Sequence, residues 1–124
     1  MRIGIDIIEI DRVRRLADRE MNGTHRFYTE DEIAYCCNHG KQQYASFAGI
    51  FSAKEAFVKA LGTGFRFGQW QEIEVCHDQW GAPSIVLQGT YREMAEQRQI
   101  GQIHLSISHS QAYAVAEIIL EERL

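Results

Sequence analysis

Hydrophobic and polar or small residues alternate at the start of the chain. Ile3, Ile5 and Ile7 are separated by Gly4 and Asp6, and this period of two predicts a β-strand whose isoleucines share one face. Asp6 then lies on the opposite face, where an acid needs water, a partner or a cation.

Helical spacing follows this strand. Asp11 is placed to cap a short helix in which Val13, Leu16 and Ala17 face inward. The sequence Thr-Glu-Asp-Glu at 29–32 has the capping-box spacing and predicts a second helix through residue 38.

The longest helical pattern covers residues 42–61, and glycines at 62 and 64 end it. Its apolar face is formed by Phe47, Phe51, Val58 and Leu61. Later patterns predict strands at 73–75 and 84–87, a helix over 89–99, and a terminal hairpin of strands 104–109 and 112–119. The mixture indicates the α+β class: a small antiparallel sheet with a long central helix and shorter helices, in one domain of residues 1–124.

The charge balance narrows the classes of partner. The net charge of −4 excludes a general nucleic-acid binder, yet residues 1–66 hold ten of the thirteen Lys and Arg residues. An anion site is therefore expected in the first half. The chain has no apolar run of about 18 residues and no signal-peptide pattern, so we expect a cytoplasmic protein that does not bind a membrane. The three cysteines, Cys36, Cys37 and Cys76, are expected to be reduced thiols because their spacing fits neither a disulfide framework nor a zinc site.

Candidate chemistry lies at the end of the long helix. Glu55 and Lys59 are four residues apart, hence on one face, and Gly62-Thr63-Gly64 follows. A carboxylate, an ammonium and a glycine turn suit a diphosphate with its metal, but the same residues also fit an exposed ion pair followed by a plain helix stop. Magnesium takes one or two carboxylates, so Asp6 and Glu55 suffice if the first strand lies beside this helix.

Three separated blocks resemble the holo-(acyl-carrier-protein) synthases, the short class of 4′-phosphopantetheinyl transferases. They are Ile3 to Ile10, Phe51 to Gly64 (with the sequence FSAKEAFVKALGTG) and Leu105 to His109. The resemblance covers nearly the whole chain, and the middle block is highly specific.

The resemblance implies an activity and a set of residues. Enzymes of that family transfer phosphopantetheine from coenzyme A to a serine of apo acyl carrier protein and release adenosine 3′,5′-bisphosphate. Their magnesium-binding acids fall on Asp6 and Glu55, and their lysine falls on Lys59. Coenzyme A contacts are implied for the glycine loop (Gly62, Gly64), for Lys59, and for His109 and Ser110.

The family also implies partners. It docks acidic carrier proteins on a basic first helix, where this chain has a stripe of Arg12, Arg15 and Arg19. A solvated helix face is the alternative reading of that stripe. The family assembles as homotrimers with sites between adjacent subunits, and its reaction serves fatty acid biosynthesis.

Two positions depart from the family pattern. Ile50 stands where arginine is usual, and Ala82 stands where lysine is usual. Both changes remove positive charge that meets coenzyme A phosphates, and we consider Lys41 or Arg66 as the compensating cation. A catalytically impaired, coenzyme A-binding relative and a non-enzymatic interaction module are the alternatives to the transferase.

Overall fold

The computed structural model describes residues 1–123. Five strands and four α-helices follow one another along the chain: β1 (Arg2–Glu9), α1 (Ile10–Met21), α2 (Glu30–Cys37), α3 (Gln43–Leu61), β2 (Ile73–His77), β3 (Pro83–Leu87), α4 (Gly89–Gln97), β4 (Ile100–His109) and β5 (Tyr113–Glu122). Short 3₁₀ turns at Gly40–Gln42 and Trp70–Glu72 precede α3 and β2. No helix in this part of the chain combines the length and apolarity needed to cross a membrane.

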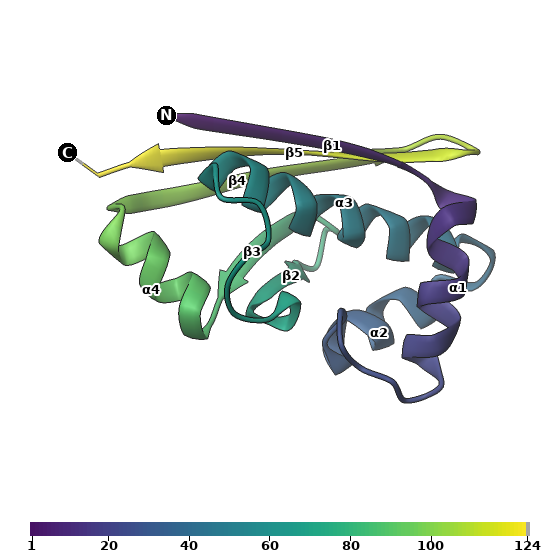
Figure 1. Cartoon of the computed structure of the whole chain (residues 1–124). Helices are drawn as coiled ribbons and strands as arrows, with labels where there is room; N and C mark the ends of the chain where they lie inside the picture. The colour runs from purple at the N-terminus through teal and green to yellow at the C-terminus, as the bar shows by residue number, and fades with distance from the viewer. Residues whose placement is uncertain (124) are drawn as a thin grey trace.

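The strands form two antiparallel sheets. The larger has the order β1-β5-β4, with Gly4 opposite Ile118 and Asp6 opposite Ala116. The smaller pairs β2 with β3. In Figure 1 the three long strands form one layer, α3 runs along its inner face, and the other helices and the small sheet cover the far side of α3. The predicted α+β architecture is confirmed.

Local signals explain most of the helix boundaries. Thr29 and Glu32 form the predicted capping box at the start of α2, and α3 ends at Gly62 in the left-handed conformation, with φ +83°. The predicted cap of α1 was wrong: Glu9 occupies the cap position, and Asp11 lies in the first turn, where its carboxylate accepts from Arg14 at 2.8 Å. The N–H of Ile10 instead bonds to the carbonyl oxygen of Ala112, so the turn between β4 and β5 replaces a side-chain cap.

A glycine allows β1 to pack against α3. A Cβ atom at Gly4 would lie 2.0 Å from the carbonyl oxygen of Ala56 and 2.7 Å from the nitrogen of Ala60. Alanines one helical turn apart leave room for this approach. The close packing brings the inner face of β1 next to the last turns of α3.

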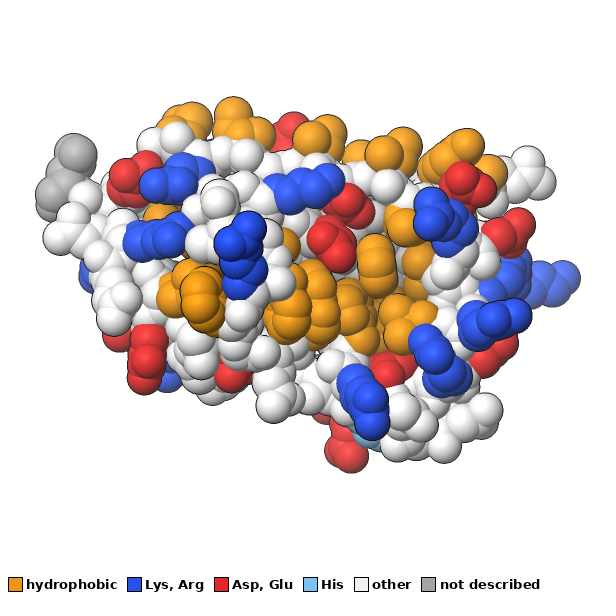
Figure 2. Space-filling model, viewed as in Figure 1, with side chains coloured by type: hydrophobic (Ala, Val, Ile, Leu, Met, Phe, Trp, Pro, Cys, Tyr) orange, Lys and Arg blue, Asp and Glu red, His pale blue; other side chains and the backbone are white. Residues whose placement is uncertain are grey.

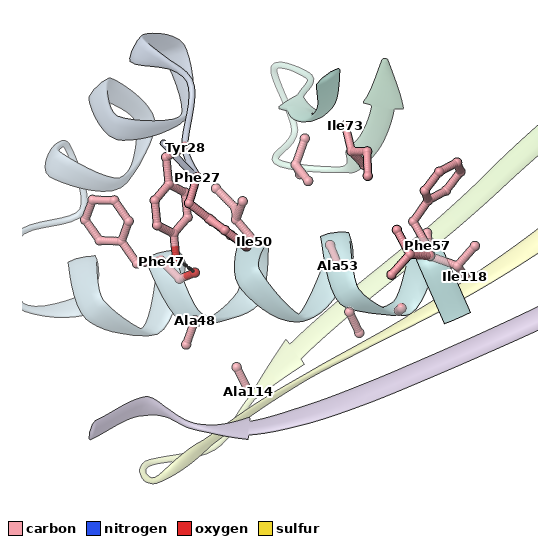
Figure 3. Packing of buried hydrophobic residues seen from close by; sticks show 14 of the residues in the cluster. Phe27, Tyr28, Phe47, Ala48, Ile50, Ala53, Phe57, Ile73, Ala114 and Ile118 are labelled. Atoms are coloured by element: carbon pink, nitrogen blue, oxygen red, sulfur yellow. Dashed lines mark hydrogen bonds between the residues drawn. The ribbon is translucent and has the colours of Figure 1, made fainter. Parts of the chain in front are cut away.

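The core surrounds α3 on both sides. Figure 3 shows Phe47, Ile50 and Phe57 of α3 among residues from the other elements. Tyr28 is fully buried there, and its hydroxyl donates to the carbonyl oxygen of Phe47 at 2.7 Å. The hydrogen bond satisfies the one polar atom of this large side chain.

The outer face of the large sheet is apolar and exposed. The side chains of Ile3, Ile5 and Ile7 are 63%, 56% and 64% exposed, and Figure 2 shows hydrophobic side chains in a row along this edge of the molecule. The predicted alternation is confirmed, with Asp6 on the inner face and the isoleucines pointing outward. Contiguous exposed apolar patches are typical of interaction surfaces.

Candidate active site

An ion pair connects β1 to α3 at the centre of the site. Lys59 Nζ lies 2.9 Å from Oδ1 of Asp6 and 3.1 Å from the carbonyl oxygen of Ile5. The side chain of Asp6 is only 14% exposed, because it faces α3. Lys59 therefore forms an ion pair with an acid on a different element. The alternative, a local ion pair between Lys59 and Glu55 on the helix surface, is not observed among the described residues.

Glu55 lies beside this pair and is half-buried. Its pKa is raised from the ordinary value, mainly by burial and further by the negative charge of Asp6, while Lys59 acts in the opposite direction. Two carboxylates from different elements thus lie near one ammonium, which is paired with Asp6. Their excess negative charge and their oxygen donors fit a divalent cation such as Mg²⁺, which needs one or two protein carboxylates and completes its shell with water and phosphate oxygens.

The glycine loop begins where α3 ends. Gly62 and Gly64 both have positive φ, +83° and +62°, and a Cβ at Gly64 would meet nothing within 4 Å. The N–H of Gly62 bonds to the carbonyl oxygens of Val58 and Lys59, so it belongs to the helix end. The loop offers open space and a close backbone approach near Lys59.

The remaining residues predicted to contact coenzyme A lie together at a different place in the fold. Lys41, His109 and Ser110 line one cavity of about 490 Å³ together with Arg14. This cavity lies at the N-terminal end of α3, since Ala45 also lines it. Ala45 and Glu55 are ten residues apart on α3, which is about 15 Å of helix rise. Within one chain the two groups of predicted coenzyme A contacts are therefore separate.

The cavity beside His109 is lined by Ile50, one of the two departures from the family pattern, and by the chain neighbours of the other, Ala82. Ile50 is 1% exposed, and it lines a cavity of about 270 Å³ with Gly81, Pro83 and His109. His39 and His77 line the same cavity. The ring of His77 stacks on Tyr35 with centroids 3.7 Å apart. Imidazoles and uncharged groups thus occupy this region, and Lys41 and Arg14 are the cations of the adjoining cavity.

The arginine stripe is exposed on α1. Arg12, Arg15 and Arg19 all lie on the solvent side of this helix, and Figure 2 shows Lys and Arg side chains gathered over the α1 end of the molecule. Arg14 is engaged instead with Asp11 and lies over the ring of Tyr44, 4.5 Å from its centroid. Within residues 1–123, no ion pair involves the three stripe arginines.

Sequence reasoning missed a buried ion pair behind the site. The side chains of Lys54 and Glu32 are fully buried, with Nζ and Oε1 2.8 Å apart. Burial lowers the pKa of Lys54 and raises that of Glu32, while their mutual attraction opposes both changes. A signal was present: Lys54 is four residues before Val58 and three after Phe51, so its position continues the apolar face of the helix.

The chain is similar to known transferases over most of its length. Residues 2–116 match the family model described as the 4′-phosphopantetheinyl transferase superfamily, and the chain belongs to this superfamily. A holo-[acyl-carrier-protein] synthase of Clostridium acetobutylicum is 45% identical over 120 residues, covering 96% of this chain and 95% of that protein.

Solved structures agree with this assignment. A holo-(acyl-carrier-protein) synthase from Bacillus anthracis in complex with CoA (3′,5′-ADP) is 36% identical with a TM-score of 0.79, covering 98% of this chain and 96% of the other. The synthase from Neisseria meningitidis is 30% identical with a TM-score of 0.85, covering 98% of each chain. Both the sequence and the fold therefore lie within the holo-acyl-carrier-protein synthase group of the superfamily.

Proposed function

We propose that this chain transfers the 4′-phosphopantetheine group of coenzyme A to a serine of apo acyl carrier protein and releases adenosine 3′,5′-bisphosphate, with Mg²⁺ bound by Asp6 and Glu55. The observation that carries the proposal is the cluster of Asp6, Glu55 and Lys59 beside the glycine loop. The synthase names of the relatives and the CoA complex of the Bacillus anthracis enzyme support it.

The chain's own residues have complementary roles in this reaction. Phosphoryl transfer depends on positioning and on neutralising the charge that develops on the leaving phosphate. Lys59 contributes one positive charge at the diphosphate, and it is held in place by Asp6. When bound, Mg²⁺ supplies Lewis acidity to the diphosphate oxygens. The carrier protein supplies the attacking hydroxyl, so no nucleophilic side chain is needed.

Lys41, His109 and Ser110 are assigned to the phosphates at the nucleotide end of coenzyme A. They line one cavity and lie on the other end of α3 from Glu55. A site completed by a neighbouring subunit resolves this separation, because the cavity of one copy then faces the carboxylates of the next. We accordingly propose a homotrimer with three shared sites.

The apolar outer face is the proposed contact between subunits. Ile3, Ile5 and Ile7 project from β1, and Tyr113 is exposed on the neighbouring strand β5. Burying such side chains between copies stabilises an assembly by roughly 25 cal/mol per Å² of apolar area.

The acidic carrier protein is proposed to dock on Arg12, Arg15 and Arg19. Their charges have no acidic partner among residues 1–123 and remain available to an anionic surface. Attraction between this stripe and the carrier speeds encounter in a salt-dependent way. The reaction belongs to fatty acid biosynthesis in the cytoplasm, where the unpaired Cys36, Cys37 and Cys76 stay reduced.

Transfer and mere binding are separable by experiment. Buried Ile50 leaves the region near His109 without the family's arginine, which favours a coenzyme A-binding relative with impaired turnover as the second candidate. Incubation with coenzyme A, Mg²⁺ and apo carrier protein should add one phosphopantetheine mass to the carrier and release an equal amount of adenosine 3′,5′-bisphosphate. Calorimetric binding of coenzyme A without any carrier mass gain would favour the second candidate and reject the transferase.

A further inference from the structure

A buried ammonium ties three segments of the chain together behind the candidate active site. Lys54 Nζ lies 2.8 Å from Glu32 Oε1 and donates to the carbonyl oxygens of Phe27, at 2.7 Å, and Trp70, at 3.1 Å. All three ammonium protons therefore have acceptors. Glu32 also accepts from the N–H groups of Thr29 and Val75, so both partners of the pair bind peptide groups.

The two carbonyl groups belong to segments that follow α1 and the glycine loop along the chain. Phe27 lies between α1 and α2, and Glu20 of α1 accepts from its N–H at 2.9 Å. Trp70 lies after the glycine loop in the chain and is the first residue of the 3₁₀ turn Trp70–Glu72. Lys54 thus links the segment after α1 and the 3₁₀ turn at Trp70 to α3, one residue before Glu55.

Stability alone is a poor explanation for this arrangement. Removing two charges from water costs several kcal/mol per ion, and well-packed hydrophobic replacements of buried ion pairs are often neutral or stabilising. A hydrophobic pair has no donor, however, and cannot fix two carbonyl oxygens from different segments at set positions. The N–H donors of Lys54 are therefore the feature that hydrophobic residues cannot replace.

We propose that Lys54 is a positioning residue for the transfer step: it fixes α1, where the carrier protein docks, relative to Asp6 and Glu55. This inference rests on the proposed function. In-line attack requires the carrier serine to lie within reach of the phosphorus atom, and a misplacement of about 1 Å can cost about 100-fold in rate. Lys54 touches no substrate and acts through the peptide groups of Phe27 and Trp70.

The test is the double variant Lys54→Met/Glu32→Met in the full chain. The double variant leaves the carbonyl oxygens of Phe27 and Trp70 and the N–H groups of Thr29 and Val75 without their partners, so we expect a lower unfolding midpoint. The folded variant should keep an unchanged calorimetric affinity for coenzyme A, with kcat for carrier modification lowered about 10- to 100-fold. Val58→Ala removes methyl groups from a buried position of α3 outside this network. It should lower stability and leave kcat unchanged.

A second variant keeps the inference testable if the double variant does not fold. Glu32→Gln retains Lys54 and both carbonyl bonds, so kcat should stay within about threefold of the wild type although stability falls. A folded double variant with wild-type kcat, or a Glu32→Gln variant whose kcat falls as far as expected for the double variant, would overturn the positioning role. A wild-type chain that transfers nothing would instead refute the proposed function itself.

Discussion

Lys59 Nζ and Asp6 Oδ1 lie 2.9 Å apart, although the two residues are separated by 53 positions along the chain. The contact joins the last turns of α3 to the inner face of β1. It forms because Gly4, two residues before Asp6, allows the strand to approach the backbone of α3. The position of the proposed metal-binding acid therefore depends on a glycine that has no chemistry of its own.

Replacing Gly4 with alanine should destabilise the protein strongly. The new Cβ would lie 2.0 Å from the carbonyl oxygen of Ala56, and neither backbone can move without disturbing the sheet or the helix. We expect a loss of about 3 kcal/mol or more in the free energy of unfolding, measured by urea denaturation. Gly101→Ala is the matched control, because its Cβ would meet mainly the flexible side chain of Arg123. Equal midpoints for the two variants would contradict the close packing of β1 on α3.

An acid on the outer sheet face should dissociate the proposed trimer. Ile5 is 56% exposed and lies opposite Glu117 on β5. Ile5→Glu would therefore bring two like charges into the contact and bury both. Light scattering should show the mass falling to that of one 14.3 kDa chain, with transfer activity lost at the same time. Trp80→Glu changes a side chain that is 85% exposed at the β2–β3 turn and should leave the assembly intact. A monomeric wild type would refute the trimer.

Mixing two inactive variants tests whether the sites are shared. Glu55→Gln removes a proposed metal ligand, and His109→Ala removes a proposed phosphate contact at the other end of α3. In a mixed assembly some interfaces combine the intact carboxylates of one subunit with the intact histidine of its neighbour. Denaturing and refolding the two variants together should restore part of the transfer rate, whereas each refolded alone stays inactive. No recovery in an assembly shown to be mixed would mean that each site lies within one chain.

The sequence predicted where the helices and strands lie better than it predicted which elements pack against one another. The alternation of Ile3, Ile5 and Ile7 predicted β1, but the period of two does not tell which face is buried. The inner face is the one with Gly4 and Asp6, because only glycine fits where β1 meets the backbone of α3. The spacing of Glu55 and Lys59 predicted one shared helix face, and Asp6 was expected to join Glu55 only if the first strand lies beside that helix. The family resemblance then assigned all three residues to one site, whose formation depends on packing between distant segments.

Other features depend on long-range pairing that the local sequence does not encode. His109 and Asp6 lie on the two strands that flank β5, where the register sets His109 opposite Ala114 and Asp6 opposite Ala116. The buried state of Lys54 likewise arises from acceptors on three other segments. Its place on the apolar face of α3 signals burial and does not identify those acceptors.

The arginine stripe should control the affinity for the carrier protein. Arg12→Ser/Arg19→Ser removes two exposed charges from α1 without touching the core. We expect the KM for the carrier to rise about tenfold with little change in kcat, and the salt dependence of kcat/KM to weaken. Coenzyme A affinity by calorimetry should not change. Arg123→Ser, an exposed arginine beyond the end of β5, serves as the control. A carrier KM equal to that of the wild type would leave the stripe as a solvated helix face.

The role of the two carboxylates is tested most directly by the rate of carrier modification, measured by mass spectrometry. The wild type, Asp6→Asn and Glu55→Gln are each assayed with added Mg²⁺ and with a chelator. We predict transfer by the wild type only when Mg²⁺ is present, and at least about 100-fold slower transfer by each variant at an unchanged unfolding midpoint. Glu30→Gln, which alters an exposed acid of α2, should retain the wild-type rate. Transfer at the wild-type rate by the Glu55→Gln protein, or by the wild type in the chelator, would contradict the account.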